Sequence, residues 1–281
     1  MRKVSFINMI GGVGKTTLST NVAHCLATRE NCKVLVVDID PQFNATQCFF
    51  SGDKYIEYLK NKGRTILDLF QENVANISTV DGVTGIKSFN YSDIKPIQIL
   101  ENLFMLPGNL NLYQIEISAG SGKENRLKKY LDEINKIYHF DYVIIDTPPT
   151  PSIWMISALL ASDYYIIPVK PDPLSYTGIE LLQNIIYQKK RDLDLNIKCM
   201  GIVLTIVEEG TIVFNKCMET IGKKKQLKNL LYKKYLKKRT DIAKFQLNQQ
   251  FILDQSKDDI KLCLTGIVQE MIKRINDDET K

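Results

Sequence analysis

Apolar positions along the chain group into short, nearly continuous runs, which are separated by longer stretches with helical spacing. The runs are rich in valine, isoleucine and tyrosine, as expected for strands that are covered on both faces. They predict strands at Lys3–Asn8, Lys33–Asp38, Leu103–Leu106, Asp141–Asp146, Tyr164–Val169 and Met200–Ile206. Helical spacing predicts helices at Lys15–Arg29, Glu124–Ile137, Gly178–Arg191 and Ile260–Ile275, and less clearly one around Ile66–Glu72.

This alternation of strands and helices indicates an α/β fold built on a doubly wound, mostly parallel sheet flanked by helices. A chain of 281 residues, 44% of them hydrophobic, is long enough to bury the core of such a fold. No internal repeat and no Pro- or Ser-rich linker divides the sequence, so we expect one domain over residues 1–281. The stretch from Ser51 to Glu101 is the least regular part of the pattern.

Composition disfavours a membrane-spanning or secreted protein. No apolar run approaches the ~20 residues that span a bilayer. The N-terminal MRKVSFINMI lacks a small-residue cleavage site, so we interpret it as a first strand rather than a signal peptide. The six cysteines include no C-x-x-C pair, which favours free thiols in a reducing compartment. We therefore expect a cytoplasmic protein.

The strongest chemical signal is FINMIGGVGKTT at residues 6–17, where a strand, a glycine-rich turn and a helix follow one another. The glycines let successive backbone N–H groups point at phosphate oxygens, and the helix adds the positive end of its dipole. Lys15 supplies a charge for the β- and γ-phosphates, and the Thr16 hydroxyl is placed to bind Mg²⁺. The nucleotide-binding residues predicted in this loop are Gly11, Gly12, Val13, Gly14, Lys15, Thr16 and Thr17.

Aspartates end two of the predicted strands. VLVVDIDPQFNAT places Asp38 and Asp40 at the end of the second strand, and YVIIDTPPT ends another strand in Asp146. The carboxyl ends of strands are where a doubly wound sheet gathers its ligand groups. A single aspartate there is usually a turn former or a helix cap. Three of them beside a phosphate-binding loop favour a Mg²⁺ site, with Asp146 as the Walker-B-type carboxylate.

With these motifs, the sequence resembles the ParA/MinD family of deviant-Walker-A P-loop ATPases, and within it the ParA/Soj plasmid and chromosome partition proteins. The resemblance rests on five motifs in the order of the family, which cover residues 1 to about 206. They are GGVGKTT, DIDPQFNAT, LPGNLNL, DYVIIDTPP and PVKPDPLSYTGIELL. The resemblance implies a P-loop NTPase fold and an ATP-driven molecular switch.

The resemblance also implies cofactors and partners. ATP and Mg²⁺ are the expected cofactors, and ATPase activity is expected to be weak without a stimulating partner. The expected partners are a second copy of the chain in an ATP-bound homodimer, DNA bound without sequence preference, and a ParB-like centromere-binding protein. Such a protein is expected to associate with the nucleoid.

Residue roles follow from the same resemblance. Lys15 and Asp40 are expected to be catalytic, Asp40 by orienting the attacking water. Thr16, Asp38 and Asp146 are expected to support Mg²⁺. Thr147–Pro149 is expected to sense the γ-phosphate, and adenine is expected beside Pro171, Asp172 and Thr205.

The loop departs from its patterns at two positions. Met9 stands where the general G-x-x-x-x-G-K-[ST] pattern has glycine, and Ile10 stands where the family signature K-G-G-x-G-K-[ST] has its first lysine. In the family that lysine reaches the phosphates of the other subunit, and a charge of this kind can be worth ~10³-fold or more in phosphoryl transfer. Isoleucine cannot replace it. Three alternatives are a weakened ATPase, a slow or inactive nucleotide switch, and a site that uses another cation such as Lys170.

Positive charge concentrates in residues 216–239, which hold ten basic residues and one acid, Glu219. Leu227, Leu230, Leu231 and Tyr235 recur at helical spacing, so a helix with an apolar stripe and a basic remainder is predicted. A solvated lysine-rich helix is the common meaning of a charge run, but this excess favours sequence-independent contacts to DNA phosphates. The predicted DNA-binding residues are Lys223, Lys224, Lys225, Lys228, Lys233, Lys234, Lys237, Lys238 and Arg239.

Other functions explain parts of the sequence. A MinD-like positioning ATPase would want a basic amphipathic helix at the extreme C-terminus, whereas this chain ends INDDETK, which an anionic membrane would repel; we therefore expect no membrane partner. An iron–sulfur reductase of the superfamily needs subunit-bridging cysteines, and no suitably spaced pair is present. A ligase of the dethiobiotin-synthetase type leaves the basic region unexplained. Because of Ile10, a nucleotide-binding regulatory protein with weak or no hydrolysis is the most serious alternative.

Overall fold

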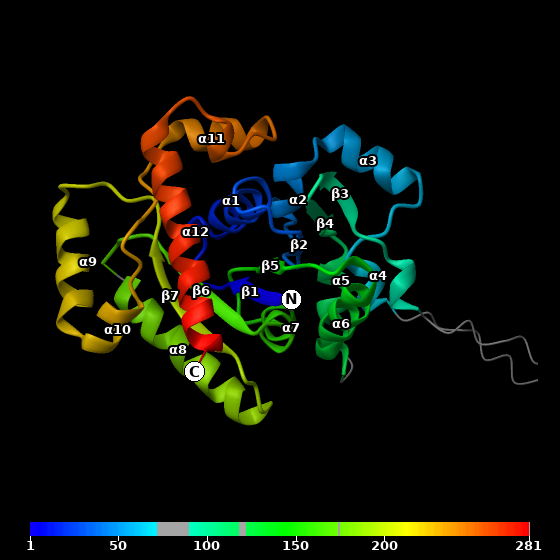
Figure 1. Ribbon diagram of the computed structural model, residues 1–281. Helices are drawn as coiled ribbons and strands as arrows, with labels where there is room; N and C mark the ends of the chain where they lie inside the picture. Colours follow the sequence, from blue (N-terminus) through cyan, green and yellow to red (C-terminus); the bar gives the residue numbers. More distant parts are fainter. Residues whose placement is uncertain (72–89, 118–121, 174, 281) are drawn as a thin grey trace, which may run out of the picture.

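A single sheet organises the chain. The computed structural model describes residues 1–71, 90–117, 122–173 and 175–280. Within these ranges seven strands form one sheet in the order β3-β4-β2-β5-β1-β6-β7 (Figure 1). Every neighbouring pair is parallel except β3 with β4. The strands are β1 (Arg2–Phe6), β2 (Val34–Asp38), β3 (Ile97–Leu100), β4 (Leu103–Leu106), β5 (Tyr142–Asp146), β6 (Tyr164–Val169) and β7 (Lys198–Leu204). The predicted doubly wound α/β fold is confirmed.

The inner strands match the sequence pattern closely. β2, β4, β5 and β6 are buried at every position, because helices cover both faces of the sheet. The predicted bounds of β4 and β6 agree with the structure. β3 is the strand that the pattern missed. It is a short antiparallel edge strand with alternating half-buried and exposed residues, in the stretch where the pattern was least regular.

Helices lie on both faces of the sheet. One face is covered by α1 (Lys15–Thr28), α2 (Asn44–Phe49), α11 (Thr240–Leu247) and α12 (Asp258–Glu279). The other is covered by α4 (Leu67–Phe70), α6 (Arg126–Tyr138), α7 (Ile153–Ala161) and α8 (Ser175–Asp192), and α9 (Ile212–Lys223) and α10 (Lys225–Leu230) pack beyond α8. The remaining elements are α3 (Gly52–Lys60), α5 (Leu112–Ile117) and 3-10 turns at Tyr91–Asp93, Lys123–Asn125 and Ile252–Asp254.

The long predicted helices are confirmed as α1, α6, α8 and α12. The loosely placed helix is the short α4, and Glu72 at its predicted end lies outside the described residues. The pattern missed α7, whose sequence IWMISALLA is apolar on nearly every side and therefore carries little periodicity.

The basic region is not the single helix that its leucine spacing predicts. α9 ends at Lys223 and α10 ends at Leu230, and the chain then runs extended beside β7. In that segment the N–H of Tyr232 donates to the Ile202 carbonyl at 2.9 Å, and the N–H of Leu236 donates to the Leu204 carbonyl at 3.0 Å. The prediction was wrong because β7 is the last strand of the sheet, and its unpaired edge takes this segment as a partner.

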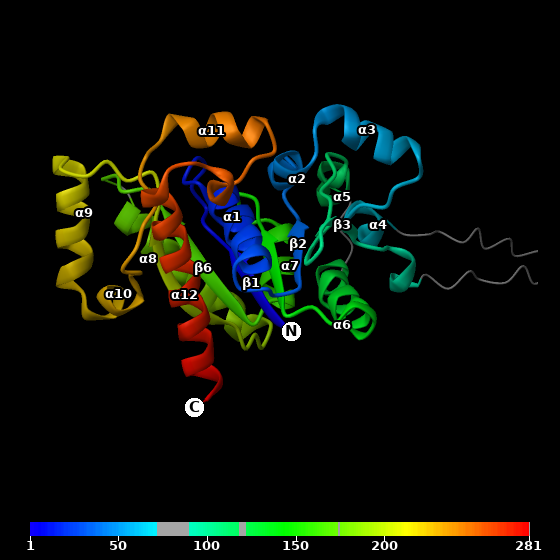
Figure 2. The same cartoon turned by 45° about the horizontal axis from the view of Figure 1, so that its top comes forward.

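The C-terminal elements return to the carboxyl ends of the strands. Figure 2 shows α11 lying across the top of the molecule beside α1 and α2, while α9 and α10 lie at the far end from α3. In the part of the chain that the structure describes, no helix is long and apolar enough to cross a membrane.

Candidate functional site

The loop between β1 and α1 has the backbone of a phosphate-binding cradle. Gly12 and Gly14 adopt left-handed conformations with φ of 69° and 75°, which side chains rarely tolerate. Gly14 is the N-cap of α1, so the helix begins at Lys15 with its free N–H groups facing the turn. The Thr205 hydroxyl donates to the Val13 carbonyl at 2.5 Å and fixes the loop from the end of β7.

A cavity of about 840 Å³ lies along this loop at the carboxyl ends of the strands. This volume is within the usual range for cofactor-sized ligands. All seven loop residues predicted to bind nucleotide line it, as do Asp40 and Pro149. Two other parts of the wall were not predicted from the sequence. They are an aromatic and apolar side from α2 and α3, and two glutamines near α11. These residues include Phe43, Phe50, Tyr55, Ile56, Gln246 and Gln249.

Lys15 is held at the cavity wall with only 7% of its surface exposed. Its Nζ donates to the carbonyl of Ile10 at 3.2 Å. Burial lowers the pKa of this ammonium group, and the carboxylates of Asp146 and Asp40 oppose that shift. A cation held this way has few competing partners when phosphate oxygens enter the cavity.

Asp146 is fully buried at the end of β5 and is held by two hydroxyl groups of α1. The Thr16 hydroxyl donates to Oδ2 at 2.7 Å, and the Ser19 hydroxyl donates to Oδ1 at 2.8 Å. Burial raises the pKa of Asp146 to about 6, against the lowering effect of these two hydrogen bonds. Thr16 and Asp146, both expected to support Mg²⁺, therefore lie in direct contact. Ser19 was missed, although its spacing of three residues from Thr16 on a helix could have indicated it.

The two aspartates after β2 lie in different surroundings. Asp40 lines the cavity, its Oδ1 accepts from the N–H of Gln42 at 2.9 Å, and burial raises its pKa. Asp38 is fully buried and does not line the cavity. Its Oδ2 accepts from both the N–H and the hydroxyl of Thr46 at 2.7 Å, and its Oδ1 accepts from the N–H of Asp40 at 3.2 Å. Asp38 therefore holds the start of α2 and the backbone that carries Asp40.

The residues expected to sense the γ-phosphate lie at the base of the site. The Thr147 hydroxyl is buried and donates to the Phe6 carbonyl at 2.7 Å. Pro149, two residues further on, lines the cavity.

The residues expected near adenine are not gathered in one place. A second hollow of about 170 Å³ shares Gly14, Thr17 and Gln246 with the large cavity, and Thr205 lines it. Pro171 and Asp172 line neither hollow. The second hollow is bounded instead by the extended segment 236–239 and by Ile242, for which no contact with nucleotide was predicted.

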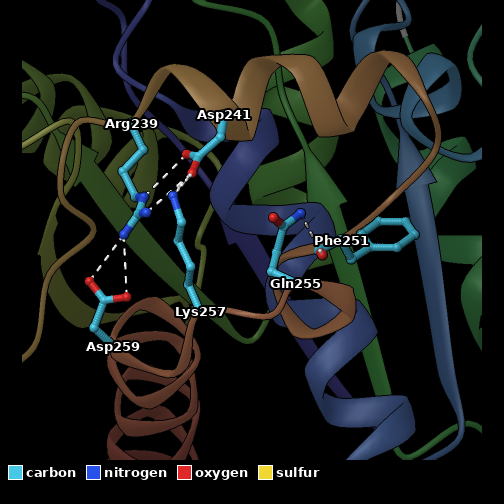
Figure 3. Close-up of polar contacts among 6 residues, drawn as sticks. All are labelled: Arg239, Asp241, Phe251, Gln255, Lys257 and Asp259. Atoms are coloured by element: carbon cyan, nitrogen blue, oxygen red, sulfur yellow. Dashed lines mark hydrogen bonds and ion pairs between the residues drawn. The ribbon is translucent and has the colours of Figure 1, made fainter.

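Many of the predicted DNA-binding side chains are already in ion pairs. Arg239 pairs with Asp241 and with Asp259, and Lys257 joins the same Asp241 (Figure 3). Lys223, Lys224, Lys237 and Lys238 pair with Glu219, Glu180, Glu209 and Glu208. Four exposed lysines have no ion pair among the described residues, namely Lys225, Lys228, Lys233 and Lys234. Except for Glu219, the acids in these ion pairs lie outside residues 216–239, so the fold supplies them.

Lys170, the cation suggested as a substitute for the missing signature lysine, is exposed and lines neither hollow. Ile10 itself does not line the large cavity either.

Known proteins resemble the chain in sequence and in fold. A family model described as an AAA domain matches residues 1–199. Sporulation initiation inhibitor protein Soj of Bacillus subtilis is 30% identical over 232 residues, which are 82% of this chain and 81% of Soj. The ParA family protein MG470 of Mycoplasma genitalium is 30% identical over 235 residues, with the same coverage of 82% and 81%.

Solved structures share the fold over nearly the whole chain. A putative plasmid partition protein of Borrelia burgdorferi, bound to AMPPNP, is 25% identical with a TM-score of 0.73, covering 97% of this chain and 98% of that one. The ATP complex of Cyanothece McdA has a TM-score of 0.75 over 97% of this chain and 96% of its own, and at 17% identity it supports the fold alone. With a matched family domain and two relatives at 30% identity, this chain belongs to the ParA/Soj family of P-loop partition proteins.

Proposed function

We propose that the protein is an ATP-dependent switch of the partition type, which binds ATP with Mg²⁺, hydrolyses it slowly, dimerises with nucleotide and binds DNA without sequence preference. The observation that carries this proposal is that Lys15 and Thr16 line one cavity along the glycine-rich loop, where the Thr16 hydroxyl donates to the buried carboxylate of Asp146. Two proteins that resemble this chain support the same function: one is named a chromosome-partitioning ATPase, and the other is the putative plasmid partition protein solved with the ATP analogue AMPPNP.

The residues of the cradle fit Mg²⁺. Among the described residues no cluster of three metal-binding side chains is present. Mg²⁺ is commonly held by one or two carboxylates together with substrate phosphates and water, and the Thr16–Asp146 pair offers hard oxygen atoms of this kind. The ion would neutralise charge on the phosphates. Asp38, which is saturated by hydrogen bonds, is assigned a positioning role toward α2 and Asp40.

In this proposal Lys15 binds the β- and γ-phosphates and Asp40 orients the attacking water. Asp40 is suited to this because it lines the cavity, only 4% of its surface is exposed, and its Oδ1 is anchored by one backbone N–H. Turnover is expected to be slow because Ile10 brings no charge to the phosphates of a second subunit. A nucleotide switch without hydrolysis is the second candidate, and the same uncharged residue favours it.

The proposed partners are a second copy of the chain, duplex DNA and a ParB-like protein, and the proposed location is the nucleoid. The four exposed lysines without ion pairs support a DNA face that extends from α10 along the segment beside β7. Backbone phosphates carry no sequence information, so such a face would bind any duplex.

Calorimetry with ATP and Mg²⁺ tests the nucleotide site. Wild-type protein is expected to bind, and Lys15→Ala is expected to lose most of the affinity, because the lysine charge and the N–H cradle act on the same phosphates. Equal affinity in the two proteins would refute the assignment. A phosphate-release assay on the wild type then separates the two candidates, since slow turnover supports the first and none above background supports the second.

A further inference from the structure

Ile10 packs against helix α8 of its own chain. Gly178 lies in the first turn of α8, and a Cβ atom placed on it would lie 2.8 Å from Cδ1 and 3.7 Å from Cγ1 of Ile10. Apart from the chain neighbours and helix backbone of Gly178, Ile10 supplies the described atoms within 4 Å of that point. The glycine therefore makes room for the isoleucine side chain.

The backbone at position 178 gives no other reason for a glycine. Gly178 is not among the residues with positive φ, so an L-residue could adopt its conformation. Glycine is also less favourable than alanine within a helix. The absence of a side chain at position 178 is therefore what allows Ile10 to approach the helix closely.

The backbone of Ile10 is held at both polar atoms. Its N–H donates to Oδ1 of Asn8 at 2.9 Å, and Nδ2 of the buried Asn8 donates to the Pro168 carbonyl of β6 at 2.7 Å. The Ile10 carbonyl accepts the 3.2 Å hydrogen bond from Lys15 Nζ. The residue whose side chain rests on Gly178 is thus the same residue that holds the ammonium group of the phosphate-binding lysine.

We propose that Ile10 and Gly178 form a latch within one subunit that positions Lys15 for the nucleotide. Ile10 lies outside the cavity wall, so it acts as a positioning residue through its carbonyl. Displacing the side chain would move that carbonyl, and with it the resting place of Nζ. Ile10, which stands at the position of the signature lysine, therefore supports the loop of its own subunit and does not reach the phosphates of a neighbouring subunit. The inference rests on the proposed nucleotide site.

A methyl exchange tests the latch directly. Gly178→Ala adds a Cβ that meets Cδ1 of Ile10, and Ile10→Val removes that Cδ1. Gly178→Ala is expected to weaken calorimetric ATP·Mg²⁺ binding about three- to tenfold, a typical coupling for residues in contact. The double variant is expected to return to within about twofold of the wild type. Gly222→Ala is the matched control, because Gly222 lies in α9 with nothing within 4 Å of its Cβ position.

The thermal stability of the same proteins separates positioning from damage. Alanine is the better helix former, so Gly178→Ala is not expected to lower the Tm in proportion to its loss of affinity. The latch would be overturned if Gly178→Ala bound ATP with wild-type affinity. It would also be overturned if the fold loss of ATP affinity in the double variant equalled the product of the losses in the two single variants.

If the wild type binds no ATP, the proposed function is refuted. The latch can still be tested by a measurement that needs no nucleotide. Reductive methylation of Lys15, followed by peptide mass spectrometry, is expected to be faster in Gly178→Ala and to return to the wild-type rate in the double variant. Equal labelling rates in all of these proteins would contradict the latch, whatever the nucleotide result.

Discussion

At the scale of single residues, Asp146 and Asp38 place two carboxyl groups side by side in the interior. The register of β2 with β5 pairs the two residues, and both are fully buried. Burial raises both pKa values, and the charge of Asp146 raises that of Asp38 further. Buried like charges destabilise a fold unless a cation compensates them. A cation bound beside Asp146 would therefore offset part of this cost.

This arrangement predicts a pH-dependent effect of Asp146→Asn. The folded-state pKa of about 6 lies above the ordinary value of 3.8, so ionisation disfavours the folded state as the pH rises through this window. In metal-free protein, the Tm of Asp146→Asn relative to the wild type is therefore expected to be higher at pH 8 than at pH 5. It is also expected to remove the extra stability that ATP with Mg²⁺ gives at pH 8. Thermal scans at both pH values check this, and an equal loss of Tm at both would contradict it.

The phosphate loop and the strand-end aspartates are the part of the site that the sequence could predict. Gly11–Thr17 join a predicted strand to a predicted helix, and Asp40 and Asp146 lie at or near the ends of two further predicted strands. Local sequence patterns were therefore enough to find them. Gln246 could not be found this way. Its Nε2 lies 3.1 Å from the Thr17 hydroxyl, but the two residues are 229 positions apart and only the fold brings them together.

At the scale of elements, the strands with continuous apolar runs were the most accurately predicted. β4 and β6 have the predicted bounds, whereas the buried helix α7 was missed because its residues are apolar on nearly every side. The segment 231–239 was predicted wrongly, because its leucine spacing suits a helix while the edge of β7 offers backbone partners to an extended chain. Tertiary pairing decided between two local conformations.

The same segment changes which lysines are available to DNA. Reversing Lys225 and Lys228 to glutamate is expected to weaken binding to any duplex about equally. It should also reduce the slope of the salt dependence by ~0.9 for each DNA phosphate that is no longer neutralised. Reversing Lys128 and Lys129 is the control. These exposed residues on α6 carry the same charge and lie at the opposite end of the molecule from α10 (Figure 1). DNA binding is measured across a salt series. Equal weakening of DNA binding in the two double variants would contradict the assignment.

At the scale of the whole molecule, the C-terminal elements pack against helix α1. Helix α12 packs against α1, and Phe251 stacks on His24 of α1 with ring centroids 4.3 Å apart. The N–H of Ile252 donates to Asn21 Oδ1 of the same helix at 2.7 Å. Because α1 begins at the phosphate loop, these contacts connect the helix that follows the loop to the elements that follow the basic region.

The central claim is that nucleotide in this site controls attachment to DNA. Co-sedimentation with long duplex DNA of two unrelated sequences, with and without ATP and Mg²⁺, tests it most directly, with anionic lipid vesicles as a parallel arm. Wild-type protein is expected to sediment with both duplexes only when ATP is present, and Lys15→Ala with neither. No ATP-dependent sedimentation with vesicles is expected. DNA binding that is the same with and without ATP, or that Lys15→Ala retains in full, would contradict the account.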